Sequence, residues 1–247
     1  MAICSAIEPV LPPEGHPQLE DAAFELVKSA SSLAGLLNPT VRVAVGELVR
    51  SMNCYYSNLI EGHNTLPRDI ERALANEYST EPQKRNLQRE AVAHIDVQQK
   101  IDSGTDDPAE PTSVAYLRWL HREFCARLPK ELLSVENPDT RERLPITPGE
   151  IRTRIVKVGL HVPPVDQDLQ ACLARFEEAY SSPMPKFRKI IAIAAAHHRL
   201  LWIHPFLDGN GRVARLMAHA AFNRLGMGGS LWSASRGLAS VADPVET

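Results

Sequence analysis

Residues 204–215, HPFLDGNGRVAR, combine twelve positions whose side chains could together transfer a phosphate-linked group. The cluster 208–211, DGNG, is a turn that the backbone can bend tightly before a helix begins. The unpaired N–H groups and the positive dipole at such a helix start favour a bound phosphate. Arg212 and Arg215 fall on one face of that helix and supply bidentate phosphate donors. This part of the chain is therefore a candidate anion site.

Two further side chains in the same stretch extend its chemistry. Asp208 offers a hard carboxylate oxygen, which suits a Mg²⁺ ion that bridges phosphate oxygens. His204 precedes the turn, and its neutral imidazole could accept a proton from an incoming hydroxyl. Each residue alone would more often belong to an ordinary turn or cap. A base, a metal ligand, a phosphate cradle and a cationic clamp in one stretch are what phosphoryl-type transfer requires.

Helices must position these residues, because apolar side chains recur at intervals of three and four over most of the chain. The clearest stripe consists of Val41, Val45, Leu48, Met52, Tyr55 and Leu59, on a helix with Thr40 as its expected N-cap. Further helices are expected over residues 18–36, from residue 67, and over 83–101, 114–128, 169–180, 187–201 and 209–225.

One segment follows a two-residue period instead. Apolar side chains alternate with polar residues or glycine over residues 156–162, which predicts a small β-hairpin at about 152–162. Residues 129–150 are rich in proline and charge and are expected to form a loop. The expected fold class is therefore all-α with one short β-hairpin.

The acidic, turn-rich stretch DSGTDDPAEP at residues 102–111 divides the chain into two parts. We expect an irregular tail over 1–17, an N-terminal helical region over 18–105 and a C-terminal core over 112–240.

The composition excludes several classes of protein. With 44% hydrophobic and 23% charged residues, the chain is not disordered throughout. Its 30 acidic and 27 basic residues give a net charge of −3, which argues against sequence-independent nucleic-acid binding. The longest apolar run, 190–196, is too short to cross a membrane. The first residues show no secretory signal and the four cysteines are scattered, so we expect free thiols and a cytoplasmic location.

The stretch 204–215 resembles the signature of the Fic family, His-x-Phe-x-(Asp/Glu)-Gly-Asn-Gly-Arg-x-x-Arg, at every defined position. The matching residues are His204, Phe206, Asp208, Gly209, Asn210, Gly211, Arg212 and Arg215. The resemblance extends over about 112–238. It implies a Fic-type helical bundle in which the hairpin at 152–162 is the flap of the family.

The typical activity of that family is transfer of AMP from ATP to a protein hydroxyl. The resemblance therefore implies a protein adenylyltransferase that modifies Ser, Thr or Tyr of a target protein, including itself. His204 would deprotonate the hydroxyl, Phe206 would anchor the loop and Asp208 would bind Mg²⁺. Residues 209–211 would cradle the α- and β-phosphates.

By the same resemblance, Arg212 and Arg215 would hold the β- and γ-phosphates, and the flap would position the target by strand addition. Family members that transfer phosphate have a lysine where this chain has Gly211, so the residue favours AMP transfer.

Residues 57–62, SNLIEG, resemble the inhibitory motif of the family, (Ser/Thr)-x-x-x-Glu-(Gly/Asn). Ser57, Glu61 and Gly62 match it at the end of the expected helix 41–62. Without the Fic signature, such a pair would more often be a solvated helix face. With it, the resemblance implies that Glu61 pairs with Arg215 and competes with the γ-phosphate of ATP.

Two alternatives remain open. The same site could remove AMP or transfer another phosphate-linked group, or the protein could bind nucleotide as an interaction module without catalysis. Relatives often continue with further helices beyond residue 237, so we expect an apolar face that a partner or a second copy would bury, as in a homodimer. We assign no role from sequence to His63, His161, Arg152 or Arg154.

Overall fold

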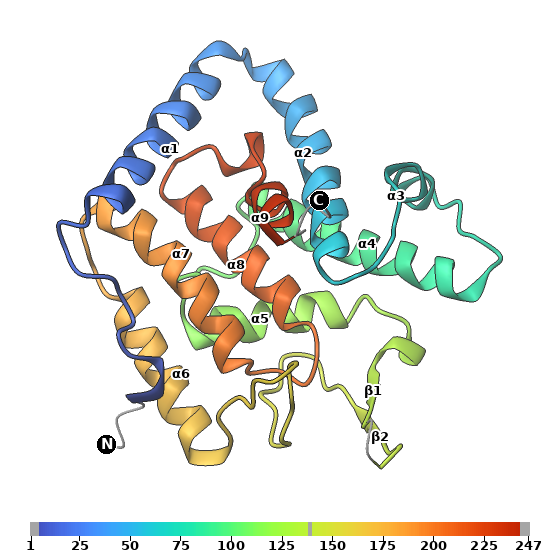
Figure 1. The fold of residues 1–247 in the computed structure, drawn as a ribbon. Helices are drawn as coiled ribbons and strands as arrows, with labels where there is room; N and C mark the ends of the chain where they lie inside the picture. The colour runs from blue at the N-terminus through green and yellow to red at the C-terminus, as the bar shows by residue number, and fades with distance from the viewer. Residues whose placement is uncertain (1–4, 138–139, 243–247) are drawn as a thin grey trace, which may run out of the picture.

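The computed structural model describes residues 5–137 and 140–242, and nine α-helices lie within them. The helices are α1 (Pro17–Leu36), α2 (Pro39–Ile60), α3 (Pro67–Leu74), α4 (Pro82–Asp102), α5 (Val114–Cys125), α6 (Asp166–Ser181), α7 (Lys186–Ile203), α8 (Asn210–Arg224) and α9 (Ala234–Ala242) (Figure 1). Short 3-10 turns cover Ser5–Ile7 (η1), Lys130–Leu132 (η2) and Gly229–Leu231 (η3). The expected all-α fold is confirmed; α9 is an additional helix.

Several helices begin where proline occupies the first helical position, which its fixed φ favours. Helices α1, α2, α3 and α4 all start in this way. In α2 the N-cap is Asn38, whose side chain accepts the N–H of Val41 at 2.9 Å. The expectation that Thr40 is the N-cap is therefore wrong, because the helix begins at Pro39.

The two strands of the structure are β1 (Ser134–Glu136) and β2 (Arg143–Pro145), which pair antiparallel with Val135 opposite Leu144. They lie within the segment expected to be a loop. Residues 152–162, expected to form a hairpin, are called the flap below. The expectation of two paired strands is wrong, because only Val158 and His161 pair there, in an isolated bridge.

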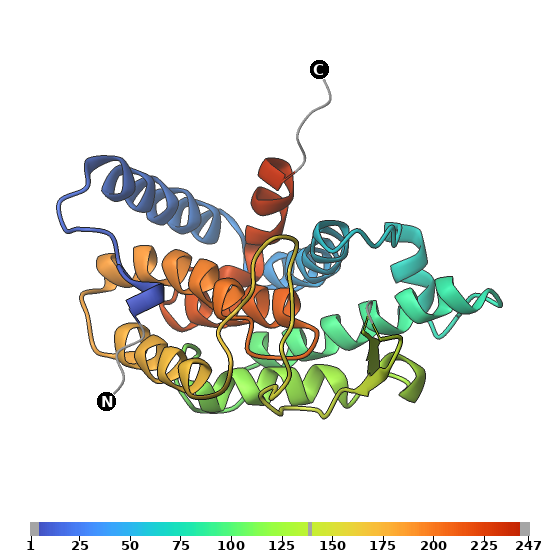
Figure 2. The same ribbon diagram turned by 60° about the horizontal axis from the view of Figure 1, so that its bottom comes forward.

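The flap is a long loop that stands out from the helices (Figure 2). Its alternating apolar side chains have no second layer to cover them. Leu160 is 98% exposed and Ile155 is 73% exposed. The two-residue period of the flap therefore reflects an exposed extended segment, with no sheet behind it.

Helices α7 and α8 pack side by side at the centre of the molecule, between α6 and α5 (Figure 1). One buried cluster joins these helices to α4, with Val97, Leu120, Phe176 and Leu200 among its fully buried members. Ile7 of η1, within the expected tail, belongs to the same cluster. The division into a tail, an N-terminal region and a core stays a prediction.

Helices α1 and α2 meet at an angle along one side of the molecule, where α1 packs on α7 and α2 packs on α4 and α9 (Figure 1). The face of α2 that is buried differs from the expected apolar stripe. Leu48 and Leu59 of that stripe are 62% and 42% exposed. The buried face consists of Gly46, Val49, Asn53, Cys54, Ser57 and Asn58. This face mixes polar and apolar residues: Cys54 packs with Ile70, Ala91 and Ile95, while Ser57 points inward to Arg215 of α8.

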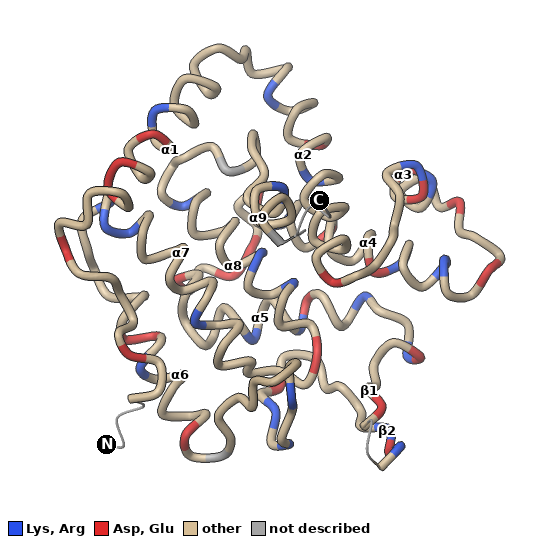
Figure 3. The backbone as a smooth tube through the Cα atoms, viewed as in Figure 1, with Lys and Arg blue, Asp and Glu red and all other residues tan. Residues whose placement is uncertain are grey.

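Acidic and basic side chains are mixed along most helices (Figure 3). Within the described residues, none of the helices combines the length and the hydropathy that crossing a membrane requires. Cys54 and Cys125 are buried free thiols, as expected. Cys172 is disulfide-bonded, which contradicts the expectation of a free thiol at that position.

Candidate active site

His204 closes the C-terminal end of α7 in a left-handed conformation, with φ 52° and ψ 60°. Pro205 follows it and disfavours a right-handed helical conformation at the preceding residue, so the helix ends there. A residue other than glycine with positive φ is strained and must be held by its surroundings. His204 is therefore a residue whose backbone the structure has to fix.

Arg152 supplies that restraint. Its guanidinium donates to the carbonyls of His204 at 2.7 Å, Arg154 at 2.9 Å and Pro164 at 2.6 Å. The main-chain N–H of Arg152 donates to the carbonyl of Pro205 at 2.9 Å. The residue is only 6% exposed, and burial lowers the pKa of its guanidinium. Arg152 thus ties the backbone of His204 to both ends of the flap.

The imidazole of His204 is set up as a neutral base. Its Nδ1 lies 3.4 Å from the carbonyl oxygen of Leu201, so this nitrogen carries the hydrogen and Nε2 keeps a lone pair. Burial lowers the pKa of His204 below its ordinary value, and the charge of Arg152 acts in the same direction. Since the net shift is downward, the ring is neutral at neutral pH.

Phe206 anchors the loop that follows. It is fully buried, and its ring stacks on His121 with centroids 4.1 Å apart and planes 5° from parallel. Nδ1 of His121 accepts the N–H of Gly149 at 2.8 Å. Burial lowers the pKa of His121 to about 4, so the ring remains a neutral acceptor. This stack fixes the floor beneath residues 206–209.

Asn210 closes the loop with its side chain. Its Oδ1 accepts the N–H of Phe206 and its Nδ2 donates to the carbonyl of Phe206, both at 2.9 Å. Gly209 is the N-cap of α8 with φ +77°, a conformation that glycine adopts without strain. Because the Asn210 side chain is used within the loop, main-chain N–H groups are what this turn can offer to an anion.

Asp208 lies exposed on the outer side of the turn, where one of its oxygens accepts the N–H of Gly209 at 2.7 Å. Within the described residues there is no cluster of three or more His, Cys, Asp or Glu side chains that could hold a metal. A single exposed carboxylate nevertheless fits Mg²⁺, which takes one or two protein carboxylates and completes its shell with phosphate oxygens and water.

Arg215 is held by the end of α2. Its Nε donates to Ser57 Oγ at 2.8 Å, and its terminal NH2 group donates to Glu61 Oε1 at 2.5 Å. The Arg215 side chain is 4% exposed and that of Glu61 is 30% exposed. Burial raises the pKa of Glu61, but the charge of Arg215 and its hydrogen bond outweigh burial and leave the pKa lowered. Glu61 is therefore an anion against the cation of α8.

The turn that follows α2 also touches the start of α8 directly. Gly62 has φ +77° and ends the helix, as expected. Glu61 Oε1 lies against Gly211, in the space that a side-chain methyl would occupy there. The carboxylate thus sits at the positively polarised end of α8, where a phosphate would also be favoured.

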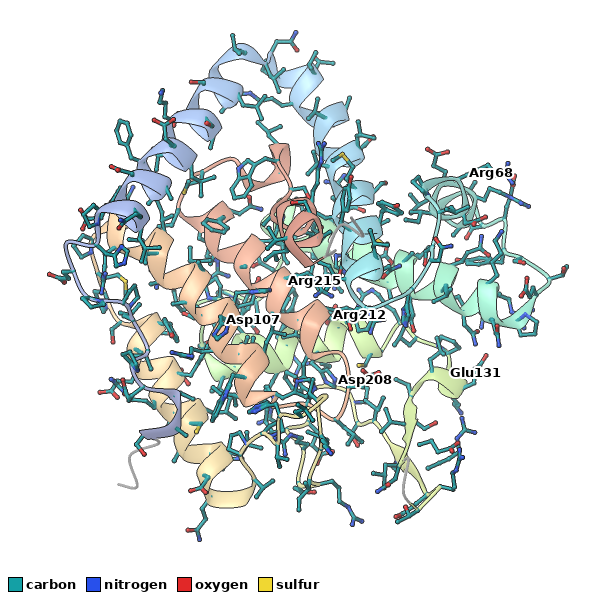
Figure 4. The ribbon with its side chains drawn as sticks, in the orientation of Figure 1. Arg68, Asp107, Glu131, Asp208, Arg212 and Arg215 are labelled. Atoms are coloured by element: carbon teal, nitrogen blue, oxygen red, sulfur yellow. The ribbon has the colours of Figure 1, made fainter. Side chains whose placement is uncertain are left out.

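Arg212, three residues before Arg215 on the same helix, has a different set of partners. Its NH2 group donates to Glu90 Oε2 at 2.7 Å and lies 3.2 Å from His63 Nδ1. Its guanidinium carbon is 5.3 Å from the centre of the Phe124 ring. Asp208, Arg212 and Arg215 are thereby gathered around the N-terminal end of α8 (Figure 4).

The structure brings all the residues of the signature together with Ser57, Glu61 and Gly62. It adds four that sequence reasoning missed. These are His63, Glu90, His121 and Arg152. They lie on other helices and loops than the signature, and no local spacing signals them.

Part of the chain matches a known protein family. Residues 111–222 match the model of the Fic/DOC family. The chain is 31% identical over 174 residues to Protein adenylyltransferase Fic of Nematostella vectensis, which is 70% of this chain and 37% of the relative. It is 43% identical over 83 residues to Protein adenylyltransferase Fic of Drosophila willistoni, which is 33% of this chain and 17% of the relative. The chain thus spans less than two fifths of the curated relatives it matches.

Solved structures show the same fold. Fic-1 (residues 134–508) of C. elegans matches with a TM-score of 0.61 at 18% identity, over 85% of this chain and 60% of that one. A Fic family protein from Desulfovibrio desulfuricans matches with a TM-score of 0.62 at 14% identity, over 90% of this chain and 63% of that one.

Proposed function

Because the chain belongs to the Fic/DOC family through residues 111–222, we propose that it is a protein adenylyltransferase. It would transfer AMP from ATP to a Ser, Thr or Tyr hydroxyl of a target protein, or of itself. The observation that carries this proposal is the position of a neutral His204 beside the helix start at Gly209. The curated relatives, named protein adenylyltransferases, support it.

His204 acts as the general base. Its free Nε2 takes the proton of the target hydroxyl while the hydroxyl oxygen attacks the α-phosphorus in line. The bond between the α-phosphorus and the bridging oxygen to the β-phosphate breaks, and pyrophosphate leaves. The proton remains on the imidazole until solvent removes it. Arg152 positions this base by fixing the backbone on which it is mounted.

The start of α8 binds the triphosphate. Residues 209–211 would cradle its α- and β-phosphates, with the main-chain N–H groups of Asn210 and Gly211 as donors because that of Gly209 is donated to Asp208. Arg212 and Arg215 would take its β- and γ-phosphates. Asp208 would hold Mg²⁺, which neutralises developing phosphate charge when bound. Phe206 and the Asn210 side chain keep the loop in shape.

The end of α2 restrains the site. Ser57 and Glu61 occupy Arg215, and Gly62 lets the chain turn so that the carboxylate reaches Gly211. ATP then binds in a pose whose α-phosphorus is misaligned, and a shift of about 1 Å can cost on the order of a hundredfold in rate. Glu61 is accordingly an inhibitory residue.

The flap receives the target segment. His161 Nε2 donates to the carbonyl of Trp202 at 2.8 Å, so the tip of the flap is fastened to the last turn of α7. Its exposed Leu160 and Val162 face solvent and offer apolar contacts to an extended peptide. The partners are then ATP and a hydroxyl-bearing protein.

The remaining expectations stay predictions. They are a homodimer, no binding of nucleic acid or membrane, and a cytoplasmic location.

The test is incubation of the Glu61→Gly protein with α-labelled ATP and Mg²⁺. We expect label on the polypeptide at a rate at least about tenfold above that of the unaltered protein. Glu47→Gly, which removes an exposed carboxylate from the same helix, is the matched control and should leave the rate unchanged. Adding His204→Ala to Glu61→Gly should abolish labelling. If labelling persists without the imidazole, the proposed mechanism is wrong; if nucleotide binds and no labelling occurs at all, the protein is a binding module.

A further inference from the structure

The turn at residues 61–63 contacts two of the three arginines of α8, Arg215 through Glu61 and Arg212 through His63. Glu61 pairs with Arg215, while His63 lies beside Arg212, three residues earlier on the same helix. Glu90 is part of the second contact, because Glu90 Oε2 accepts from Arg212 at 2.7 Å and lies 3.2 Å from His63 Nδ1. The turn after α2 is therefore connected to the two cations by two separate carboxylates.

Glu90 is built into the helical core, unlike an ordinary surface carboxylate. Its side chain is 12% exposed and that of Arg212 is 5% exposed. Burial raises the pKa of Glu90, but the His63 hydrogen bond and the charge of Arg212 outweigh it and leave the pKa lowered. The carboxylate thus stays ionised and compensates a guanidinium that would otherwise be buried alone.

The contact uses only part of the guanidinium. Both polar neighbours of Arg212 lie at its NH2 nitrogen, and Phe124 packs against its face. Among the described residues, Arg212 Nε is buried and has no hydrogen-bond partner. A buried donor without a partner is costly, and a phosphate oxygen is the natural acceptor for it at a helix N-terminus.

We propose that Glu90 is a positioning residue that fixes Arg212 with its unpartnered donor toward the nucleotide, and that His63 joins this pair to the turn carrying Glu61. The inference rests on the proposed nucleotide site. It assigns opposite effects on the proposed activity to the two residues. Glu90 supports nucleotide binding by orienting Arg212, while His63 adds to the restraint by giving the turn a second attachment.

The opposite role for Glu90 makes a different prediction. If this carboxylate competed with phosphate for Arg212, as proposed for Glu61 at Arg215, its removal would strengthen ATP binding. If it orients Arg212, its removal weakens ATP binding even though a negative charge near the triphosphate has been lost. The direction of the change therefore separates the two roles.

The first experiment measures ATP affinity by calorimetry with Mg²⁺, in the Glu61→Gly protein so that Arg215 is free. We expect Glu90→Ala to weaken binding about tenfold, because one charge-assisted hydrogen bond orients the guanidinium. Glu90→Gln keeps an acceptor oxygen and should stay within about threefold of the parent. Asp96→Ala is the matched control, since Asp96 faces Arg127 at 3.8 Å on the exposed side of the same helix.

Glu90→Asp keeps the charge but shortens the side chain. It tests the same role if the Glu90→Ala protein does not fold. Orientation predicts that this variant also binds ATP more weakly. Unchanged or tighter binding in Glu90→Ala, or in Glu90→Asp should the alanine variant not fold, overturns the role of Glu90. If the Glu61→Gly parent itself binds no ATP, the proposed nucleotide site fails instead.

The second experiment tests His63 in the otherwise unaltered chain. His63→Ala should raise self-labelling by about threefold to tenfold, between the unaltered protein and Glu61→Gly, because the turn then keeps only its Glu61 attachment. In the Glu61→Gly background the same change should have no further activating effect. A His63→Ala protein that labels itself no faster than the unaltered protein removes His63 from the restraint.

Discussion

The carboxylate of Glu61 lies against Gly211. A Cβ atom added to Gly211 would come within 2.0 Å of Glu61 Oε1, which is closer than the 3.0 Å that such a contact needs. The same Cβ would stand 3.0 Å from a terminal nitrogen of Arg215. Glycine at this position therefore allows the ion pair to settle on the start of α8. It also leaves that helix end open to a phosphate once the carboxylate withdraws.

Gly211→Ala should displace Glu61 without activating the protein. The methyl would collide with the carboxylate, but it would also cover the N–H groups to which a phosphate must come close. We expect ATP affinity to fall at least about tenfold in the Glu61→Gly background, measured by calorimetry. Gly237→Ala, at a helical glycine with open space around it, is the control and should bind ATP normally. ATP binding equal to that of the control would show that the triphosphate does not approach Gly211.

Arg152→Ala should lower kcat while leaving ATP affinity nearly unchanged. The side chain holds the carbonyl of His204 and the ends of the flap, and it contacts none of the residues proposed to hold the nucleotide. In the Glu61→Gly background we expect kcat to fall at least about tenfold and the free energy of unfolding to fall by about 3 kcal/mol. Arg152→Lys, which cannot reach three carbonyls at once, should recover little.

Chemical denaturation and initial rates measure both effects. Arg154→Ala removes an exposed arginine two residues away and should preserve stability. If Arg152→Ala raised the KM for ATP and left kcat intact, Arg152 would belong to nucleotide binding and its assigned role would be wrong.

The pH profile of the Glu61→Gly protein should report His204. The neutral imidazole is the base, so activity is present above its pKa and is lost as the pH falls through it. Burial lowers this pKa below 6.5, and removal of the nearby Glu61 charge lowers it further. We therefore expect kcat to be level near neutrality and to decline with a midpoint below pH 6.5. A midpoint at or above 6.5 contradicts a buried neutral base.

Asp102→Ala should destabilise the protein. Asp102 accepts hydrogen bonds from Arg50 of α2 at 3.0 Å and His219 of α8 at 2.7 Å, and its side chain is 7% exposed. Removing it leaves a buried cation unpaired, at a cost of about 3 kcal/mol in denaturant unfolding near pH 7. Asp96→Ala, at an exposed pair, should cost less than about 1 kcal/mol.

The stabilisation by Asp102 has a defined pH dependence. Burial raises its pKa, but its hydrogen bond to His219 and its further partners leave the pKa below 3.8. For a lowered carboxyl pKa, the stabilisation is present above the unfolded-state pKa and disappears as the pH falls through the folded-state value. The difference between the unaltered and Asp102→Ala proteins should therefore shrink below about pH 4. A difference that stays constant down to pH 2 would exclude this linkage.

Local sequence patterns predicted the features that depend on residues close together in the chain, which are the helices and the two motifs. Helix periodicity, together with the proline at residue 67, predicted eight of the nine helices of the described residues in order, and the expected bounds lie within three residues of the observed ones. The signature around His204 and the motif around Glu61 also led to residues that the structure places in contact.

Features that depend on distant packing could not be read in this way. The apolar stripe containing Leu48 predicts a buried face, yet α2 buries polar Ser57 because a guanidinium of α8 lies opposite. The alternation in the flap predicts strands, yet no second layer covers them. Arg152 and Glu90 find their partners about 52 and 122 positions along the chain, beyond the reach of any local pattern.

From Gly46 onward helix α2 packs against α4 and α9, and its last turn reaches Arg215 of α8 through Ser57 and Glu61. Lifting that turn therefore requires no swing of the whole helix. Backbone amides in the middle of α2 should keep their protection against hydrogen–deuterium exchange in the Glu61→Gly protein, while those of residues 60–63 exchange faster. An activating molecule would then need to bind only the few residues of this last turn. The overall dimensions of the protein in solution would hardly change.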